Sequence, residues 1–361
     1  MSTAALILLG VVFVLACVSA WVQWRYALDD RPARFDVTTA DGWALAVWHR
    51  PAVARRFQTP VLLCHGLANN HAFMDFHGAQ NLARFLSEAG FDCYSVDLRG
   101  AGASRSAHDL PADATVDDHV HFDVPAVVDE VLRRADAPRL LWVGHSLGGV
   151  IGLAAAPALG TRLAGIVTIG TPLFFRFTHG VRRLLWLGHV LAVWGQFDAT
   201  LARLVAPLAG RVALPGGEKL SSNLANIAPR TQRYLLANVF APIWKGVMAQ
   251  LDDWVKNDVC RSVDGQVDYR AGLAQVRCPA LVLGGSVDLL CPMAATRGLF
   301  DALGTPDKRM VVLGTASGHS ADYGHGDLVT GRRASEEVYP EVLSLLREAA
   351  LRAEQAPPVN G

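Results

Sequence analysis

Residues 140–152 read LLWVGHSLGGVIG, and this stretch decides the fold. It begins as a run of aliphatic and β-branched residues, which is typical of a buried strand, and it stops abruptly at a serine between glycines. The stretch LGGVIGLAAAPAL (147–159) predicts a helix of small residues that can pack closely on a sheet. A serine at such a point is either part of a plain turn or the exposed nucleophile of a sharp strand-to-helix turn.

Other apolar runs along the chain also read as strands, with helical spacing between them. The predicted strands are 60–66, 91–100, 139–146, 163–172, 279–288 and 308–314, and the predicted helices lie near 79–89, 124–135, 292–303 and 332–352. A hairpin over 35–51 turns at Asp41-Gly42. Strands that are apolar throughout and alternate with helices predict an α/β fold, with a mostly parallel, doubly wound sheet covered on both faces.

The alternation breaks after residue 172 and resumes near 278. We therefore expect an α/β core at 33–172 and 278–352, a helical cap inserted at 173–277, and a disordered tail at 353–361. The aromatic residues of the cap either form its interior or line an acyl-chain pocket; they are Phe174, Phe175, Phe177, Trp186, Trp194, Trp244 and Trp254. Residues 174–187 are both basic and apolar, which fits a helix packed on the core or a second membrane contact.

The N-terminus reads as a membrane segment. Residues 4–22 are AALILLGVVFVLACVSAWV, without a charge, and a helix needs roughly 20 such residues to cross a bilayer. A cleaved signal peptide is the alternative, but the first residues lack the Lys or Arg of a signal peptide. We expect a transmembrane anchor at 1–26. Because Arg25, Arg31 and Arg34 follow the segment, the positive-inside rule places the catalytic domain in the cytoplasm.

Composition and residue spacing argue against a nucleic-acid partner, a disulfide framework and a metal site. Lys+Arg and Asp+Glu both number 33, so the chain has no net field to hold a nucleic acid. The six cysteines form no Cys-x-x-Cys pair and match no zinc pattern, and we expect free thiols in a reducing compartment. The run DDHVHFD (117–123) has no standard metal-site spacing and predicts a solvated loop leading into a helix.

The spacing Gly144-x-Ser146-x-Gly148 has the strand-before, helix-after context that a nucleophile requires. An orienting acid and a base should follow it in the chain. Asp288, after the strand at 279–288, fits the acid, while His319 and His325 both qualify as the base after the last strand. The amides of Leu147 and Leu67 are the candidate donors for an oxyanion.

Together, HGLANN (65–70), GHSLGG (144–149), GGSVDLLCP (284–292) and YGHGDL (323–328) resemble the α/β-hydrolase family. The resemblance covers residues 33–352 and implies a serine hydrolase with Ser146, Asp288 and His325 as its triad. The chain's ending resembles the acid-lipase branch, whose His-x-Asp stretch favours His325 over His319. The cap also resembles that of polyhydroxyalkanoate synthases, but these enzymes use a cysteine as nucleophile where this chain has Ser146. Haloalkane dehalogenases of the same fold carry an aspartate at that position, so their chemistry does not carry over either.

We therefore expect a membrane-anchored serine hydrolase that cleaves carboxylic esters with apolar acyl chains and needs no metal or cofactor. Two alternatives stay open. An acyltransferase would use the same triad with an alcohol or thiol in place of water. A non-catalytic binding protein could retain the fold alone. The sequence leaves the ester, its chain length and the oligomeric state undetermined.

Overall fold

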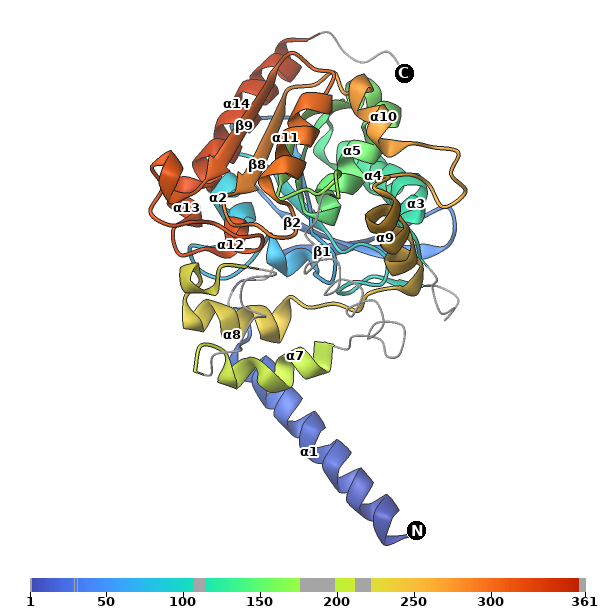
Figure 1. The fold of residues 1–361 in the computed structure, drawn as a ribbon, viewed down its shortest axis with the longest axis vertical. Coiled ribbons are helices and arrows are strands. Elements are labelled where there is room, and N and C mark those ends of the chain that lie inside the picture. Colours follow the sequence, from blue (N-terminus) through green and yellow to red (C-terminus); the bar gives the residue numbers. More distant parts are fainter. Residues whose placement is uncertain are drawn as a thin grey trace.

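The computed structural model describes residues 2–28, 30, 32–106, 114–175, 199–211 and 222–356. Its strands are β1 (Ala33–Thr38), β2 (Trp43–Arg50), β3 (Val61–Cys64), β4 (Cys93–Val96), β5 (Arg105–Ser106), β6 (Leu140–His145), β7 (Leu163–Ile169), β8 (Ala280–Gly285) and β9 (Lys308–Leu313). They form one nine-stranded sheet in the order β1-β2-β4-β3-β6-β7-β8-β9, with β5 beside β2 (Figure 1). Neighbours from β4 to β9 in this order pair in parallel, whereas β2 pairs antiparallel with β1 on one side and with β4 on the other. The predicted mostly parallel sheet and the hairpin are confirmed.

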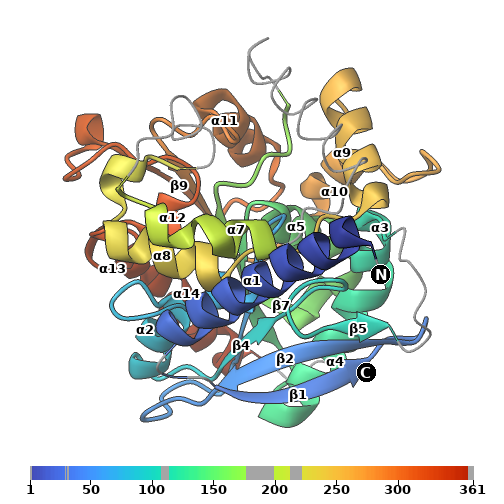
Figure 2. The same ribbon diagram turned by 90° about the horizontal axis from the view of Figure 1, so that it is seen from below.

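Helices cover both faces of the sheet (Figure 2). The core helices are α2 (Leu82–Glu88), α3 (Val116–Asp118), α4 (Val124–Ala135), α5 (Leu147–Leu159), α11 (Met293–Ala302), α12 (Asp327–Thr330), α13 (Ala334–Glu337) and α14 (Tyr339–Gln355). Alternate residues of one strand face opposite layers, so Leu62 packs with α4 and α5 while Leu63 packs with α2 and α14. Two buried faces explain why the central strands are apolar throughout.

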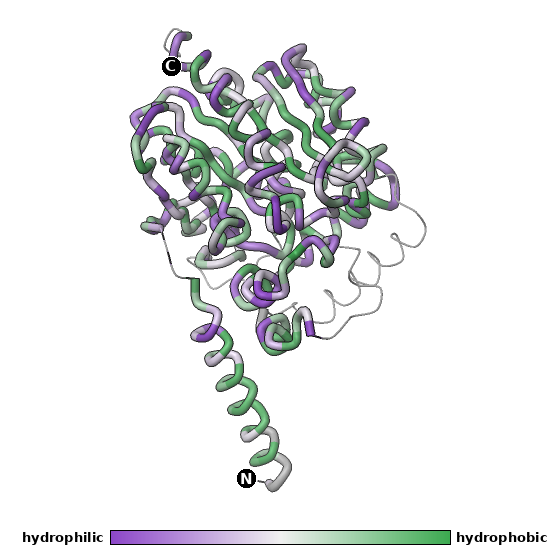
Figure 3. Tube along the Cα trace, turned by 90° about the vertical axis from the view of Figure 1, so that its left-hand side faces the viewer, coloured by the Kyte–Doolittle hydropathy of each residue, from purple (hydrophilic) through white to green (hydrophobic). Residues whose placement is uncertain are grey.

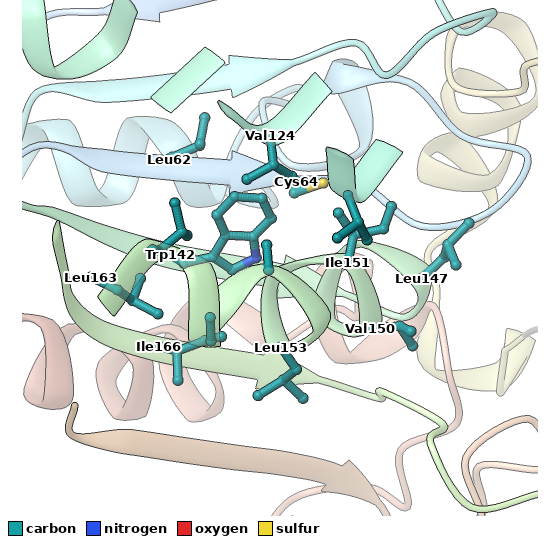
Figure 4. Close-up of a cluster of buried hydrophobic side chains, with 14 of the residues drawn as sticks. Leu62, Cys64, Val124, Trp142, Leu147, Val150, Ile151, Leu153, Leu163 and Ile166 are labelled. Atoms are coloured by element: carbon teal, nitrogen blue, oxygen red, sulfur yellow. The ribbon is translucent and has the colours of Figure 1, made fainter. Parts of the chain in front are cut away.

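The contact between β6 and α5 is close because of small residues (Figure 4). The buried ring of Trp142 on β6 lies under α5 and donates a hydrogen bond from Nε1 to the carbonyl of Gly148 at 3.1 Å. A Cβ on Gly152 would lie 2.3 Å from Nε1 of Trp142. The helix therefore approaches the sheet at a distance that only glycine at this position permits.

The insertion is helical where the structure describes it. Its helices are α7 (Ala199–Val205), α8 (Pro229–Asn238), α9 (Lys245–Asn257) and α10 (Tyr269–Gly272). Within the described part of 173–277 there are isolated β-bridges but no strand. Phe175 and Trp254 are buried with the core, whereas Phe177, Trp186, Trp194 and most of the stretch 174–187 lie outside the described residues.

The N-terminal segment forms the helix α1 (Thr3–Arg25). Among the described residues, it is the one helix long and apolar enough to cross a membrane, over Ala5–Arg25. A signal sequence would have the same length and composition.

Two local expectations at the C-terminus are wrong. α14 continues to Gln355, and the carboxylate of Glu354 accepts hydrogen bonds from the amides of Gln58 at 2.7 Å and Thr59 at 3.0 Å, so residues 353–355 belong to the fold rather than to a tail. The helix predicted near 332–352 is divided into α13 and α14. Pro340 lies in the first turn of α14, where its missing N–H is tolerated, but it could not continue a preceding helix.

The stretch 117–123 is also not the solvated loop that its composition predicts. It forms α3 and a π-helical turn over His119–Asp123, in which His119 and Asp123 are buried. The Asp123 carboxylate accepts bonds from Nε and Nη2 of Arg99 at 2.8 and 2.6 Å and contacts Nδ1 of His119 at 2.8 Å. The charge of Asp123 is therefore directed inward to a buried arginine, a pairing that the local sequence pattern does not reveal.

Candidate active site

Ser146 lies where β6 ends and α5 begins, with φ 52° and ψ −120°. Such a backbone conformation is strained for a residue with a side chain, and strain of this kind concentrates at functional sites. The amide of Ser146 is held by the carbonyl of Ile169 on the neighbouring strand at 2.9 Å. The turn thus presents the serine side chain at the carboxyl edge of the parallel strands.

The two glycines of the motif are required by packing. A Cβ on Gly148 would lie 2.3 Å from the carbonyl oxygen of Cys64 on β3, and one on Gly144 would lie 2.4 Å from the carbonyl oxygen of Gly148. Both distances are far below normal contact, and backbone atoms cannot move aside easily. The Gly-x-Ser-x-Gly spacing therefore follows from the tightness of the turn.

Asp288 and His325 meet beside this turn. The Oδ2 atom of Asp288 lies 2.8 Å from Nδ1 of His325, and both side chains are buried. The other carboxylate oxygen of Asp288 accepts the amides of Leu290 and Cys291, both at 2.8 Å. Because a carboxylate can only accept here, Nδ1 of His325 donates to Asp288, and in the neutral ring Nε2 carries no proton.

The pair packs against the end of β7, next to the strand that carries Ser146. A Cβ on Gly170 would lie 3.1 Å from Nδ1 of His325 and 3.2 Å from Oδ2 of Asp288. His145, which precedes the serine, places its ring 4.8 Å from that of His325 and its Nε2 3.2 Å from the His325 carbonyl. The structure therefore brings together three segments that are far apart in the sequence.

His319 lies elsewhere in the same loop. Its Nδ1 is 3.2 Å from both the amide and the carbonyl oxygen of Gly314, so its ring contacts the backbone of its own loop. Asp288 is thus paired with His325 and not with His319.

The two candidate oxyanion donors border one small cavity of about 30 Å³. Leu147 is the first residue of α5, so its amide has no acceptor within the helix. Leu67 follows β3, and a Cβ on the preceding Gly66 would lie 2.9 Å from that of Ser146. From the cap, Pro242, Ile243, Trp244 and Val247 also line it.

Two buried histidines support this site, and sequence reasoning assigned them no role. Nδ1 of His65 lies 2.8 Å from the Gly66 carbonyl, and its Nε2 accepts the amide of Leu98 at 3.2 Å. A ring that donates from Nδ1 and accepts at Nε2 is neutral, and it fixes the loop that carries Leu67. The sequence did contain a signal for them, because His65 directly follows one apolar strand and His145 is the last residue of another. The carboxyl ends of these two parallel strands lie at the same edge of the sheet.

Burial lowers the pKa of His65 to about 4, and it lowers the pKa of His145 well below its usual value. In the unfolded chain both rings titrate near pH 6.5. The unfolded state therefore binds more protons below pH 6.5, and acid destabilises the fold.

We expect the free energy of unfolding to fall as the pH is lowered from about 6.5 towards 4, with a slope of up to about 1.4 kcal/mol per pH unit for each of these histidines. Denaturant titrations at several pH values would measure it. The His65→Asn variant should show a shallower slope, and the exposed His121→Asn control should keep the wild-type slope. A wild-type stability that is constant across this range would contradict the prediction.

The described residues contain no group of three or more His, Cys, Asp or Glu side chains that could hold a metal ion. The cysteines among them are free, and all but Cys17 and the half-buried Cys278 are buried. Burial raises the pKa of the Cys64 and Cys291 thiols. These thiols are therefore protonated and act as small apolar side chains.

Comparison with known proteins shows the family to which this fold belongs. A family model described as the alpha/beta hydrolase fold matches residues 59–321. Lipase member N of Mus musculus is 24% identical, with 87% of each chain covered, and gastric triacylglycerol lipase of Bos taurus is 23% identical, with 86% of this chain and 87% of that protein covered. The structure of a thermophilic esterase from Thermogutta terrifontis superposes with a TM-score of 0.59 at 20% identity, covering 88% of this chain and 99% of the esterase. The chain therefore belongs to the α/β-hydrolase fold family, and within that family it is similar to lipases and esterases.

Proposed function

We propose that the protein is a serine hydrolase that cleaves carboxylic esters through an acyl-enzyme intermediate, with Ser146 as nucleophile, His325 as base and Asp288 as the orienting acid. The observation that carries the proposal is the 2.8 Å hydrogen bond between Asp288 and His325 beside the strained turn at Ser146. A nucleophile, a base and a group that orients the base are the minimum that acyl transfer from an ester requires.

In the first step Oγ of Ser146 attacks the ester carbonyl while Nε2 of His325 takes its proton. The carbonyl oxygen becomes an oxyanion, for which the amides of Leu67 and Leu147 are the proposed donors. The C–O bond to the alcohol then breaks, and His325 returns the proton to the departing alcohol. In the second step His325 activates a water that attacks the acyl-enzyme, and the acid and free Ser146 are released.

Asp288 acts through His325. Its carboxylate stabilises the imidazolium that forms in each step and holds the ring in the tautomer that leaves Nε2 as the base. The two amides on its other oxygen keep the carboxylate oriented, so the ring is positioned before substrate binds.

The cavity beside the proposed oxyanion donors has apolar side chains on one side, including Ile243 and Val247 of the cap, as well as Arg99 and His119, and its apolar part supports an ester with an apolar acyl chain. We also propose that α1 is retained as a membrane anchor, because Val22 near its end is fully buried against the cap. Basic residues after α1 favour a cytoplasmic catalytic domain.

The test is hydrolysis by the full chain in detergent micelles. We expect it to hydrolyse a p-nitrophenyl ester series, with medium and long acyl chains preferred over acetate, and to react covalently with a fluorophosphonate. A preference for acyl transfer to an added alcohol over hydrolysis would favour the acyltransferase alternative. The absence of both turnover and labelling would refute a serine hydrolase and favour a binding protein.

A further inference from the structure

The end of α1 is fastened to the cap. Val22 is buried with Ala206 and Ala237, which lie beside or within the cap helices α7 and α8. The ring of Tyr26 meets that of Tyr234 edge-on, with centroids 5.4 Å apart. Figure 1 shows α1 leaving the molecule beside α7 and α8, with the sheet on their far side. A helix that enters a bilayer would therefore place the cap, and not the far end of the core, next to the membrane.

A row of apolar side chains is exposed at this junction. Leu201, Val205 and Leu208 are 59%, 40% and 53% exposed, and their spacing of four and three residues puts them on one helical face. We call these three residues the cap stripe. They belong to α7 and the 3-10 turn Ala206–Leu208 that follows it, directly beside α1 (Figure 2). An apolar row of this kind on a folded surface indicates a contact that the described part of the chain does not supply.

The neighbouring part of α1 has the features of a membrane interface. Trp21 and Trp24 are 48% and 75% exposed near its end, at the level where aromatic side chains gather at a bilayer surface. The rest of the helix towards the N-terminus is apolar along its length (Figure 3). The cap stripe thus continues an apolar surface that α1 begins.

The charged residues of the described segments nearest to α1 are basic. The described segments 199–211 and 222–251 contain no Asp or Glu, and neither does α1. Their basic residues are Arg25, Arg203, Arg211, Arg230, Arg233 and Lys245. An apolar row that, among the described residues of these segments, has only basic charges near it matches the boundary between acyl chains and anionic headgroups. A second protein copy would bring the same positive charges to the contact, and these would repel.

The cap also forms part of the proposed active site. Ala241 donates its amide to the carbonyl of Ala68 at 2.8 Å, and Phe240 bridges Asn69, so the segment after α8 lies on the loop that carries Leu67. Three residues of this segment line the cavity beside Leu147. One insertion therefore connects the membrane side of the molecule to the site of ester cleavage.

We propose that the cap stripe lies in the headgroup boundary of the bilayer that holds α1, and that the active site takes its substrate, a membrane-resident lipid ester, directly from that bilayer. The substrate class rests on the proposed serine hydrolase function. The lipid contact of the stripe does not, and the two are tested separately.

The lipid contact is tested with the full chain in vesicles of phosphatidylcholine and phosphatidylglycerol. In a Cys17→Ser background, an environment-sensitive fluorophore is attached at Val205→Cys, or at Val263→Cys as an exposed control away from the cap stripe. We expect blue-shifted emission that doxyl lipids quench at position 205, and polar, unquenched emission at 263. Emission at 205 that lipid does not quench would overturn the proposal, and a blue shift that instead depends on protein concentration would assign the stripe to a second copy.

Delivery of substrate is tested with the variant Leu201→Ser/Val205→Ser/Leu208→Ser. We expect hydrolysis of p-nitrophenyl palmitate in the vesicles to fall by at least about tenfold, while hydrolysis of soluble p-nitrophenyl butyrate stays within about twofold of wild type. Unchanged palmitate hydrolysis would overturn the delivery role, and an equal loss on both esters would assign the stripe to folding.

The matched control is Val53→Ser/Val263→Ser/Val267→Ser, which removes three exposed valines elsewhere on the surface and should leave both activities unchanged. If wild type cleaves neither ester, the proposed hydrolase function fails. The fluorophore result still decides whether the stripe contacts lipid.

Discussion

Ser146→Ala is expected to lower kcat for ester hydrolysis by at least about 10⁴-fold and to abolish fluorophosphonate labelling, because the acyl-enzyme cannot form without Oγ. Alanine retains the Cβ and adds no bulk to a turn that already accommodates a side chain at φ 52°. The thermal unfolding midpoint should therefore stay within a few degrees of wild type, which separates a lost nucleophile from a lost fold.

His325→Ala and His319→Ala are the matched variants that test which histidine acts as the base. His325 lies 2.8 Å from Asp288, whereas His319 contacts Gly314 of its own loop. We expect His325→Ala to lose activity on the scale of Ser146→Ala, and His319→Ala to keep it within about threefold. An inactive His319→Ala with a folded, active His325→Ala would reverse the assignment of the base. Activity retained in Ser146→Ala would refute the serine mechanism altogether.

Asp123→Ala is expected to destabilise the fold by about 3–5 kcal/mol, because it leaves the buried Arg99 guanidinium without its main partner. Arg99 would retain its two bonds to Asp41, at 2.7 and 3.2 Å, and the ring of His119 would lose its acceptor. The thermal unfolding midpoint of the full chain in detergent micelles should fall by several degrees, since each kcal/mol corresponds to a few degrees in a domain of this size.

The control for this prediction is Asp129→Ala on α4. Asp129 is also paired with an arginine, Arg162, but its side chain is 66% exposed. Solvent screens such pairs, so we expect a loss below about 1 kcal/mol. Equal effects of the two substitutions would mean that burial of the Arg99 pair contributes nothing to stability.

The sequence by itself determined the class of fold and the position of the candidate nucleophile. Apolar runs alternating with helices predict a parallel sheet whatever their order in space, because each strand must bury both faces. The turn at Ser146 is also a local property, since Gly144 and Gly148 lie within two residues of it. The hairpin turn at Asp41-Gly42 and the helix over 147–159 are likewise set by residues that are adjacent in the sequence.

Only the tertiary structure decided which residues meet across long separations. His319 and His325 are six positions apart in one loop, and the path of the backbone, rather than any local pattern, puts His325 against Asp288. The run 117–123 reads as a solvated loop because its charges have no visible partner in the sequence, yet Arg99 meets Asp123 in the interior. Periodicity and turn chemistry are set by adjacent residues, whereas such pairings depend on how whole layers pack, and so they appear only in the folded chain.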